Sequence, residues 1–205
     1  MTSVSVIHVV DDDASFRTSM SRLLQAQGYR TALYESGNAF FEKLPAGEAG
    51  CILLDLQMAG MQGLELQKRL AKIGNILPVI FLTAHGDIRA GVQAIKAGAE
   101  DFLSKPVSPQ ALFECVERAL ARNAEQRQQR DRLGAMRQLV ASFTPREAEV
   151  FALFVRGKLN KQIAHELGTT VRTIKAHRHV VMTKLEVSSI AEAVSIAERL
   201  GMLAG

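Results

Sequence analysis

Charged and hydroxyl-bearing side chains stand within two residues of the ends of strand-like runs at several separated points of the N-terminal half. They are Asp11 and Asp12 after residues 4–10, Asp55 after residues 51–54, Thr83 after residues 78–82 and Lys105 after residues 100–103. Carboxylates that gather in one place repel each other and need a counter-ion, and a hard cation such as Mg²⁺ prefers oxygen ligands. An aspartate that faces such a cation and a lysine is a competent nucleophile toward a phosphoryl group. If these positions converge, the sequence predicts phosphoryl chemistry.

The segment from Gly50 to Gly60 indicates how these side chains are positioned. Four apolar residues run into Asp55 between two glycines, a pattern typical of a strand buried on both faces. Taken alone, such an aspartate is equally well explained as a cap for the following helix. However, strand and helix patterns alternate five times over residues 1–120, which predicts a doubly wound, five-stranded parallel sheet of the α/β class. The carboxyl ends of such strands meet at one edge, where open α/β sheets keep their sites.

The C-terminal part of the chain lacks the alternation that is typical of strands. Helical patterns cover residues 145–156, 160–167, 171–185 and 189–200. Thr144, Pro145 and Glu147 supply a cap, a proline and an acid at the start of the first of these helices. We therefore expect a small all-α domain over residues 142–205.

Residues 121–141 connect the two parts. The stretch 123–132, NAEQRQQRDR, favours a helix but has no apolar face, as in helices that bridge domains in solvent. Heptad positions through this region are too broken to predict a coiled coil. We expect an α/β domain over residues 1–120, a helical linker over 121–141 that is continuous or nearly so with the last helix of that domain, and the all-α domain beyond it.

The composition is that of an ordinary soluble protein, with 47% hydrophobic and 22% charged residues. No apolar run reaches the length of a membrane span and no signal sequence is apparent, so we expect a cytoplasmic protein without a membrane partner. Cys51 and Cys115 are expected to be reduced core thiols. Residues 1–120 carry 11 basic and 13 acidic residues (net −2), and residues 121–205 carry 14 and 8 (net +6). The second part is thus the candidate for an anionic partner.

The acidic positions and their order along the chain resemble the receiver domain of two-component response regulators, a flavodoxin-like fold, over residues 5–120. The resemblance implies that Asp55 is the phosphoacceptor and that Asp12 binds Mg²⁺ (or Mn²⁺) directly. It also implies that Asp11 acts through metal-bound water, and that Asp55 and the backbone carbonyl of Gln57 complete the protein ligands.

The same resemblance assigns roles near the end of the receiver. Thr83 and Lys105 bind the phosphoryl oxygens, and the Lys105–Pro106 peptide bond is expected to be cis. Met58-Ala59-Gly60 stands where the family usually has Met-Pro-Gly, a departure that concerns the rigidity of the loop and not the chemistry. Gln57 and His85 flank the line along which water attacks, so we expect Gln57 to affect the lifetime of the phosphoryl group.

A helix over residues 171–185 would carry a polar, basic stripe on one face. The stripe consists of Arg172, Lys175, Ala176, His179 and Thr183. Ile174, Val181 and Leu185 fall on the opposite face and would pack inward. Such a helix suits the major groove of DNA, although the pattern alone fits a solvated basic face as well.

The segment from Thr144 to Leu185 closely resembles the LuxR-type helix-turn-helix, with the likeness covering nearly all of residues 143–200. The resemblance implies that Lys175, Ala176 and His179 face the base edges of double-stranded promoter DNA. Residues that it assigns to contacts with the DNA phosphates or to capping of helices are Asn160, Lys161, Thr173 and Arg178. It also implies that the helix over residues 189–200 pairs two such domains on a two-fold site. With VVDDD (9–13) and TAHGD (83–87), the whole chain is similar to the FixJ/NarL group, and closest to its FixJ-like branch.

This combined resemblance implies a response regulator transcription factor that a sensor histidine kinase phosphorylates on Asp55. Thr83 would then be drawn toward the phosphoryl oxygens, and Phe102 would rotate inward as the switch aromatic. The remodelled surface would form a homodimer through Val92 and Lys96, so that two DNA-reading helices reach neighbouring half-sites. We expect transcriptional activation, with RNA polymerase as a further partner.

Two alternative functions compete with this interpretation, an enzyme and a regulator that does not depend on phosphorylation. An aspartate-nucleophile phosphatase needs a second aspartate two residues after the nucleophile, and Gln57 stands there, so we do not expect an enzyme. The more serious alternative is a regulator that binds DNA without phosphorylation and uses its receiver only for dimerisation.

Overall fold

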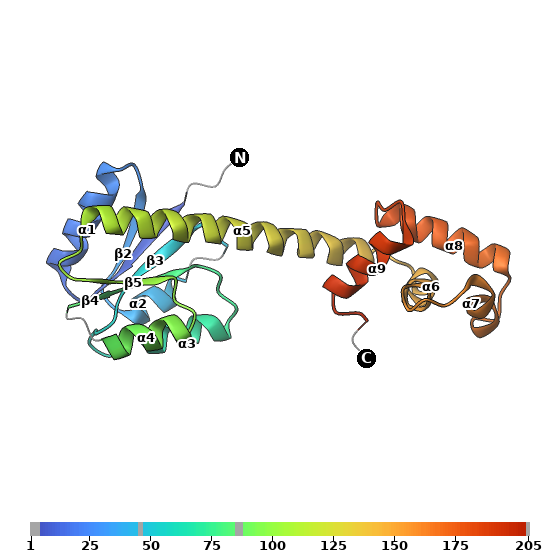
Figure 1. Cartoon of the computed structure of the whole chain (residues 1–205), viewed down its shortest axis with the longest axis horizontal. Coiled ribbons are helices and arrows are strands. Elements are labelled where there is room, and N and C mark those ends of the chain that lie inside the picture. Colours follow the sequence, from blue (N-terminus) through green and yellow to red (C-terminus); the bar gives the residue numbers. More distant parts are fainter. Residues whose placement is uncertain (1–4, 45–46, 85–87, 204–205) are drawn as a thin grey trace. The chain divides into compact units, whose positions relative to one another are not determined.

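The structure is a computed structural model that describes residues 5–44, 47–84 and 88–203, with the side chains of residues 88–90 excepted. The chain divides into two compact units, residues 1–127 and residues 128–205 (Figure 1). Each unit has a hydrophobic core of its own, built from side chains of several helices or strands.

The first unit is a parallel sheet with a helix after each strand. Its elements are β1 (Val6–Val10), α1 (Ala14–Ala26), β2 (Arg30–Tyr34), α2 (Gly37–Glu42), β3 (Gly50–Asp55), α3 (Gly63–Lys72), β4 (Val79–Thr83), α4 (Ile88–Lys96), β5 (Asp101–Ser104) and α5 (Pro109–Ala141). All strand pairs are parallel, in the order β2-β1-β3-β4-β5. The predicted doubly wound, five-stranded sheet is confirmed. Its strand order reverses between β1 and β3, a switch point at which such sheets place their sites.

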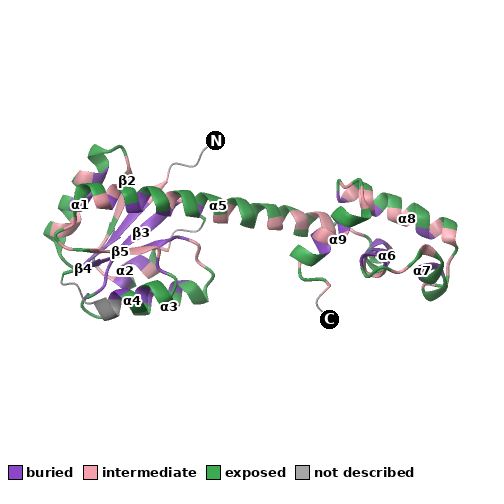
Figure 2. Cartoon of the chain, viewed as in Figure 1, coloured by how far each residue is buried: buried purple, intermediate pink, exposed green. Residues whose placement is uncertain are grey.

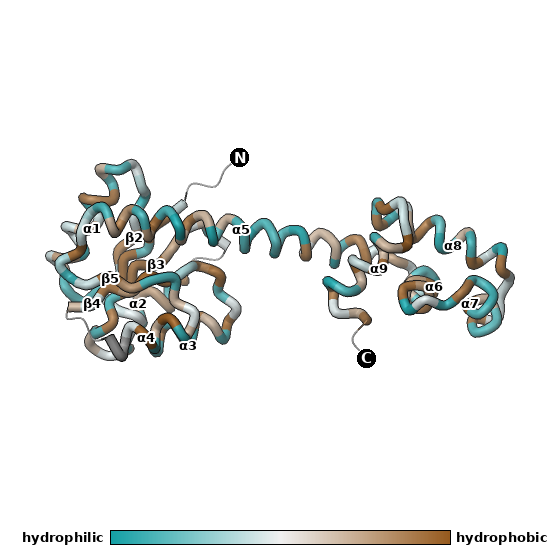
Figure 3. Tube along the Cα trace, in the orientation of Figure 1, coloured by the Kyte–Doolittle hydropathy of each residue, from teal (hydrophilic) through white to brown (hydrophobic). Residues whose placement is uncertain are grey.

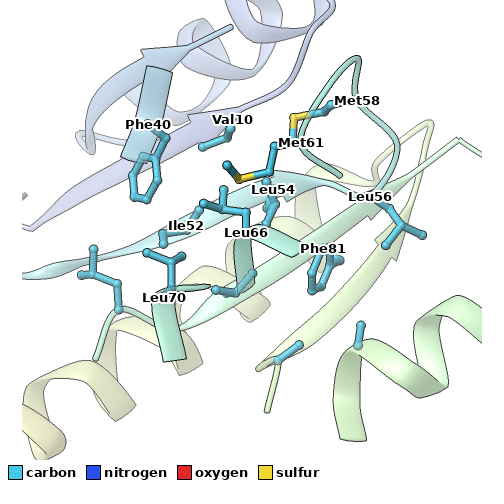
Figure 4. Packing of buried hydrophobic residues seen from close by; sticks show 14 residues of the cluster. Val10, Phe40, Ile52, Leu54, Leu56, Met58, Met61, Leu66, Leu70 and Phe81 are labelled. Atoms are coloured by element: carbon cyan, nitrogen blue, oxygen red, sulfur yellow. The ribbon is translucent and has the colours of Figure 1, made fainter. Parts of the chain in front are cut away.

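Two apolar clusters cover the two faces of this sheet. On one face, Phe40 of α2 and Leu66 of α3 pack with Ile52 and Leu54 of β3 (Figure 4). On the other face, side chains of α1 and α5 pack with alternate residues of the same strand, among them Cys51. Every residue of β3 is buried, as expected for a central strand that helices cover on both sides.

The two cysteines of the chain, Cys51 and Cys115, are free and buried in the second of these clusters. Burial raises the pKa of the Cys51 thiol to about 12. Burial and the hydrogen bond that Cys115 Sγ donates to Asp101 Oδ2 (3.1 Å) raise the pKa of Cys115 to about 11. Both are therefore core thiols, as the sequence predicts.

Helix α5, 33 residues long, begins in the first unit and ends in the second. Leu112 and Val116 near its start belong to the core under the sheet, whereas Met136 and Val140 near its end pack against the core of the second unit. The stretch between these ends is mainly hydrophilic (Figure 3). The expected continuity between the last helix of the sheet domain and the linker is thus observed. No helix within the described ranges is both long and apolar enough to cross a membrane.

The second unit is all-α, as predicted. Its further helices are α6 (Pro145–Val155), α7 (Asn160–Glu166), α8 (Val171–Lys184) and α9 (Ile190–Arg199). Helix α6 begins with a capping box, in which Thr144 Oγ1 accepts from the Glu147 backbone N–H and the Glu147 carboxylate accepts from the Thr144 backbone N–H. Phe151, Ile174 and Val181 are among the fully buried side chains of the core, and Figure 2 shows buried and exposed residues side by side on α8.

Candidate functional site

The switch point of the sheet brings three carboxylates together. Asp11 and Asp12 follow β1, Asp55 ends β3, and one ligand oxygen from each lies within 4.8 Å of the others. Asp11 is fully buried and Asp55 nearly so, whereas Asp12 is exposed. The structure therefore assembles the acidic site that the strand pattern predicts, from residues more than 40 positions apart.

Lys105 supplies the positive charge of this site. Its ammonium group lies 2.6 Å from Asp11 Oδ2 and 3.3 Å from Asp55 Oδ2. The same nitrogen stands 4.1 Å from the centre of the Phe16 ring of α1, a cation–π contact. The backbone N–H of Lys105 donates to the Thr83 carbonyl at the end of β4 (2.7 Å), and the Lys105–Pro106 peptide bond is cis, as expected. The end of β5 thus holds the lysine against two of the three carboxylates.

Backbone N–H groups fix the orientation of the carboxylates. The N–H of Asp13 donates to Asp11 Oδ1 (2.9 Å) and the N–H of Ala59 donates to Asp12 Oδ2 (3.0 Å). A longer bond joins the Gln57 N–H to Asp55 Oδ1 (3.4 Å). Asp13 itself caps α1, since its carboxylate accepts from two N–H groups of the first turn. The third aspartate of the run therefore has a structural role, while the first two face the site.

The environment of Asp55 acts on its pKa in two directions. Burial raises the pKa of this carboxyl group and the Asp11 charge adds to the increase, while Lys105 opposes both. The net shift is upward. A cation placed among these oxygens would favour the charged forms of all three carboxylates.

The donor set of this site fits a hard divalent cation. Carboxylate oxygens on three residues, one of them exposed to solvent, match the ligands that Mg²⁺ and Mn²⁺ prefer. No sulfur or imidazole ligand lies in this cluster of described residues. The acidic cluster is therefore consistent with the divalent metal sites of receiver domains.

The remaining residues predicted for the first unit lie around this cluster. Thr83 is buried at the end of β4, next to the register pair Asp55 and Leu82. Phe102 is half-buried on β5, and its ring lies 3.2 Å from where a Cβ on Gly91 of α4 would stand. Exposed positions are Gln57 in the loop after β3 and Val92 and Lys96 on α4. His85 lies outside the described residues.

Helix α8 presents the predicted DNA-reading residues to solvent. Lys175, Ala176 and His179 are exposed on one face, whereas Ile174 and Val181 are buried on the other. The hydroxyl of Thr170 caps the helix and accepts from the Thr173 backbone N–H (3.1 Å). The stripe is thus accessible to a ligand, while the opposite face packs into the core and anchors the helix.

The residues predicted to contact DNA phosphates are partly engaged with each other. Arg178 of α8 donates from Nη1 to Asn160 Oδ1 at the start of α7, and its guanidinium carbon lies 5.0 Å from the centre of the Phe154 ring. Lys161 is exposed on α7, and Thr173 also shares a hydroxyl contact with Thr170 (2.9 Å). Arg178 and Asn160 therefore fix α8 against α7.

Sequence reasoning missed two side chains of α1 that border the acidic site. Phe16 faces the Lys105 ammonium, and Arg17 donates from Nη1 to the Asp11 backbone carbonyl (2.7 Å). The helical period marks Phe16 as a core residue, and nothing in the sequence pairs it with a lysine 89 positions later.

Comparison with known proteins covers both units. Residues 7–117 match the response regulator receiver domain, and residues 141–197 match the bacterial regulatory proteins of the luxR family. The response regulator protein TmoT of Ectopseudomonas mendocina is 38% identical over 196 residues, which cover 96% of this chain and 89% of that protein. The transcriptional regulatory protein FixJ of Bradyrhizobium diazoefficiens is 38% identical over 204 residues, or 99% of each chain.

A solved structure covers the sequence of both units. The response regulator StyR matches with a TM-score of 0.81 and 43% identity, over 95% of this chain and 98% of that one. These similarities agree with both domain matches. They also agree with the acidic cluster at the switch point and with the exposed stripe of α8. The chain belongs to the LuxR/FixJ family of response regulators, which are transcription factors that join a receiver to a LuxR-type DNA-binding domain.

Proposed function

We propose that this response regulator accepts a phosphoryl group on Asp55 from a phosphohistidine of a sensor histidine kinase. A carboxylate oxygen of Asp55 attacks phosphorus, the P–N bond breaks as the P–O bond forms, and the histidine nitrogen leaves with the electron pair. The observation that supports this most directly is the position of Lys105 Nζ, 2.6 Å from Asp11 and 3.3 Å from Asp55. That ammonium group can exchange its contact with the Asp55 carboxylate for a contact with an oxygen of the incoming phosphoryl group.

Asp11, Asp12, Asp55 and the Gln57 carbonyl would hold the Mg²⁺ or Mn²⁺ ion. When bound, the ion neutralises negative charge on the phosphoryl oxygens. Asp11, fixed by the Asp13 N–H and by Lys105, keeps the donor set in place before the phosphoryl group arrives. The hydroxyl of Thr83 would move to bind a second phosphoryl oxygen. We propose that this movement of Thr83 allows the Phe102 ring to rotate inward.

The proposed reader of double-stranded promoter DNA is α8. Lys175 would donate to guanine O6 or N7, with Ala176 and His179 facing the neighbouring base edges. Lys161 would contact a phosphate, while Thr173, Asn160 and Arg178 would hold the ends of α7 and α8 near the backbone. The net charge of +6 over residues 121–205 supports this assignment, because phosphate contacts supply much of the affinity for DNA.

Phosphorylation is proposed to act through a homodimer. Val92 and Lys96 are exposed on α4, and the apolar side chain of Val92 retains 46% of its accessible surface. A second copy packed there would bury this surface, and α9 would pair the DNA-binding units on a two-fold site. The resulting dimer would activate transcription in the cytoplasm with RNA polymerase.

We propose that the chain is divided into domains as the sequence predicts: a receiver over residues 1–120, a linker over 121–141 and a DNA-binding domain over 142–205.

Substitution of the phosphoacceptor tests this proposal. Acetyl phosphate with Mg²⁺ is expected to phosphorylate the wild-type chain, to dimerise it and to raise its affinity for DNA. Asp55→Asn removes the nucleophile, so no mass gain and no donor-dependent dimer are expected, while weak, salt-sensitive DNA binding persists. Asp131→Asn makes the same change at an exposed carboxylate of α5 and should behave as wild type.

Intact-mass spectrometry, sedimentation velocity and DNA footprinting provide the measurements. If the wild-type chain gains the phosphoryl mass but its dimer fraction and footprint stay the same, phosphorylation does not control this regulator. The phosphorylation-independent alternative, with the receiver as a dimerisation module, would then replace the proposal.

A further inference from the structure

Asn123 is a buried polar residue on the helix that leaves the receiver. Its side chain is 1% exposed, although its neighbours Ala124 and Glu125 are exposed. Asn123 Oδ1 accepts from the backbone N–H of Gly50 (3.1 Å), and Asn123 Nδ2 donates to the backbone carbonyl of Ile76 (2.9 Å). One amide thus contacts the starts of two segments that lie far from it in sequence.

The two bonds of Asn123 replace one rung of the sheet. In the β3–β4 ladder, the Ile52 N–H donates to the Pro78 carbonyl (2.9 Å). The next rung of a parallel pair lies two residues earlier on both strands, so it would join the Gly50 N–H to the Ile76 carbonyl. These are the two groups that Asn123 bonds, which means that its amide stands between the strands where the direct bond would be.

Two arginines on either side of Asn123 extend the attachment. Arg122 Nη1 pairs with Glu100 Oε2 (2.8 Å), just before β5, and Arg127 Nη1 donates to the Gly47 carbonyl (2.6 Å), just before β3. Both arginines are partly exposed to solvent, whereas Asn123 between them is buried.

We propose that Asn123 is a positioning residue that couples phosphorylation of the receiver to DNA binding, an inference that depends on the proposed role of Asp55. Its two partners begin the segments that carry Asp55 and Thr83 at their other ends. A buried amide that loses a partner is left unsatisfied, which is costly, so a shift of β3 against β4 has to be followed by α5. The same helix continues to Ala141 and supplies Met136, Leu139 and Val140 to the packing of the second unit.

Two variants of the full-length chain test the coupling. Asn123→Ala removes both hydrogen bonds, while the isosteric Asn123→Asp still accepts from Gly50 but places a carboxylate against the Ile76 carbonyl. Gln128→Ala, at an exposed position of the same helix, is the control. Each protein is treated with acetyl phosphate and Mg²⁺, and its phosphorylated fraction and its DNA affinity with and without phosphorylation are measured.

The expected result distinguishes a loss of coupling between the two units from a loss of phosphorylation at Asp55. Both Asn123 variants should phosphorylate Asp55 to the wild-type extent and keep the wild-type affinity for DNA without phosphorylation. The gain in affinity on phosphorylation, about 5–150-fold for a typical allosteric coupling, should fall at least about fivefold in both variants and stay unchanged in Gln128→Ala. Variants that keep the full gain would overturn the inference, whereas a wild-type chain that is not phosphorylated would overturn the proposed function instead.

A measurement on the wild-type chain covers the case in which the variants fail to fold. Amide hydrogen exchange at Gly50 reports the bond to Asn123 directly, because this N–H is the donor. Coupling predicts that phosphorylation changes the exchange rate at Gly50 several-fold. An unchanged rate at Gly50 in a chain that is phosphorylated and gains DNA affinity would refute the role of Asn123.

Discussion

The acidic site and the DNA-reading surface are constructed in opposite ways. The acidic site takes one or two side chains from the ends of β1, β3, β4 and β5, over a span from Asp11 to Lys105, and buries most of them. The DNA-reading surface takes its predicted base contacts from α8 alone and leaves them exposed. The geometry of the first site is therefore a property of the whole sheet, and that of the second is a property of one anchored helix.

This difference predicts how each site responds to change. A small displacement of the strand ends that carry the acidic site should disturb this site, because buried charges depend on close partners. On α8, the loss of one exposed side chain should remove only that side chain's contact with DNA. Substitutions in each of the two sites test this contrast.

Gly63→Ala should damage the acidic site from a distance. A Cβ at Gly63 would lie 2.4 Å from the backbone carbonyl oxygen of Asp55 and 2.9 Å from the Phe81 ring, so the strand end must move. We expect a loss of about 3 kcal/mol in the free energy of unfolding of the receiver, at the upper end of overpacking. The phosphorylation rate should fall while DNA binding without phosphorylation is kept.

The matched control is Gly134→Ala on α5, where an added Cβ meets no atom within 4 Å. This substitution should stabilise the helix by about 0.5–1 kcal/mol. Urea unfolding followed by circular dichroism and the rate of phosphorylation by acetyl phosphate measure both variants. A wild-type phosphorylation rate for Gly63→Ala would contradict the dependence of the acidic site on sheet packing.

Lys175→Ala should act only on DNA binding. The side chain is exposed, so the fold should be unchanged, and loss of a base contact is expected to cost about 1–3 kcal/mol in binding free energy. Lys72→Ala, the same change at an exposed position of the receiver, should leave the affinity for DNA unaltered. Titration with promoter DNA at several salt concentrations gives the measurement, and a wild-type affinity for Lys175→Ala would remove α8 as the reader.

Glu147 gives the stability of the DNA-binding unit a small dependence on pH. The hydrogen bond from Lys184 Nζ (2.6 Å) and that from the Thr144 backbone N–H (2.8 Å) hold the pKa of Glu147 below its ordinary value. A lowered pKa in the folded state means that this stabilisation is complete above the pKa of the unfolded chain and is lost as the pH falls through the folded value.

Thermal unfolding of wild type and Glu147→Gln over a range of acidic pH tests this effect. The wild-type unit should have the higher melting temperature near neutral pH, and the difference should shrink as Glu147 becomes protonated. Glu198→Gln, at an exposed position of α9, should show no such trend. A constant difference between wild type and Glu147→Gln would mean that the charge of Glu147 contributes nothing.

The contrast between the two sites also explains what the sequence could predict. Apolar runs and turn residues are local signals, and the parallel topology then forces strand ends together. Asp11 and Lys105 could thus be placed side by side although 94 positions separate them, and the structure puts their charged atoms 2.6 Å apart. On α8 the helical period alone separates the exposed Lys175 from the buried Ile174.

Contacts that depend on backbone groups from elsewhere in the chain could not be predicted in the same way. The stretch 123–132 has no apolar period, which indicated a fully solvated helix, yet Asn123 is buried against Gly50 and Ile76. No pattern in the sequence distinguishes this asparagine from its polar neighbours. The bond between Arg178 and Asn160 was missed for a related reason, because the basic character of α8 suggests phosphate contacts before it suggests an intramolecular partner.

The burial of both cysteines has a practical consequence for physical measurements on this protein. With thiol pKa values of about 12 for Cys51 and about 11 for Cys115, almost no thiolate is present at neutral pH. Maleimide reagents react with thiolates, so the native chain offers them almost no background. A fluorophore or spin label can therefore be attached at a cysteine introduced on the surface of either unit, and both natural residues can stay in place.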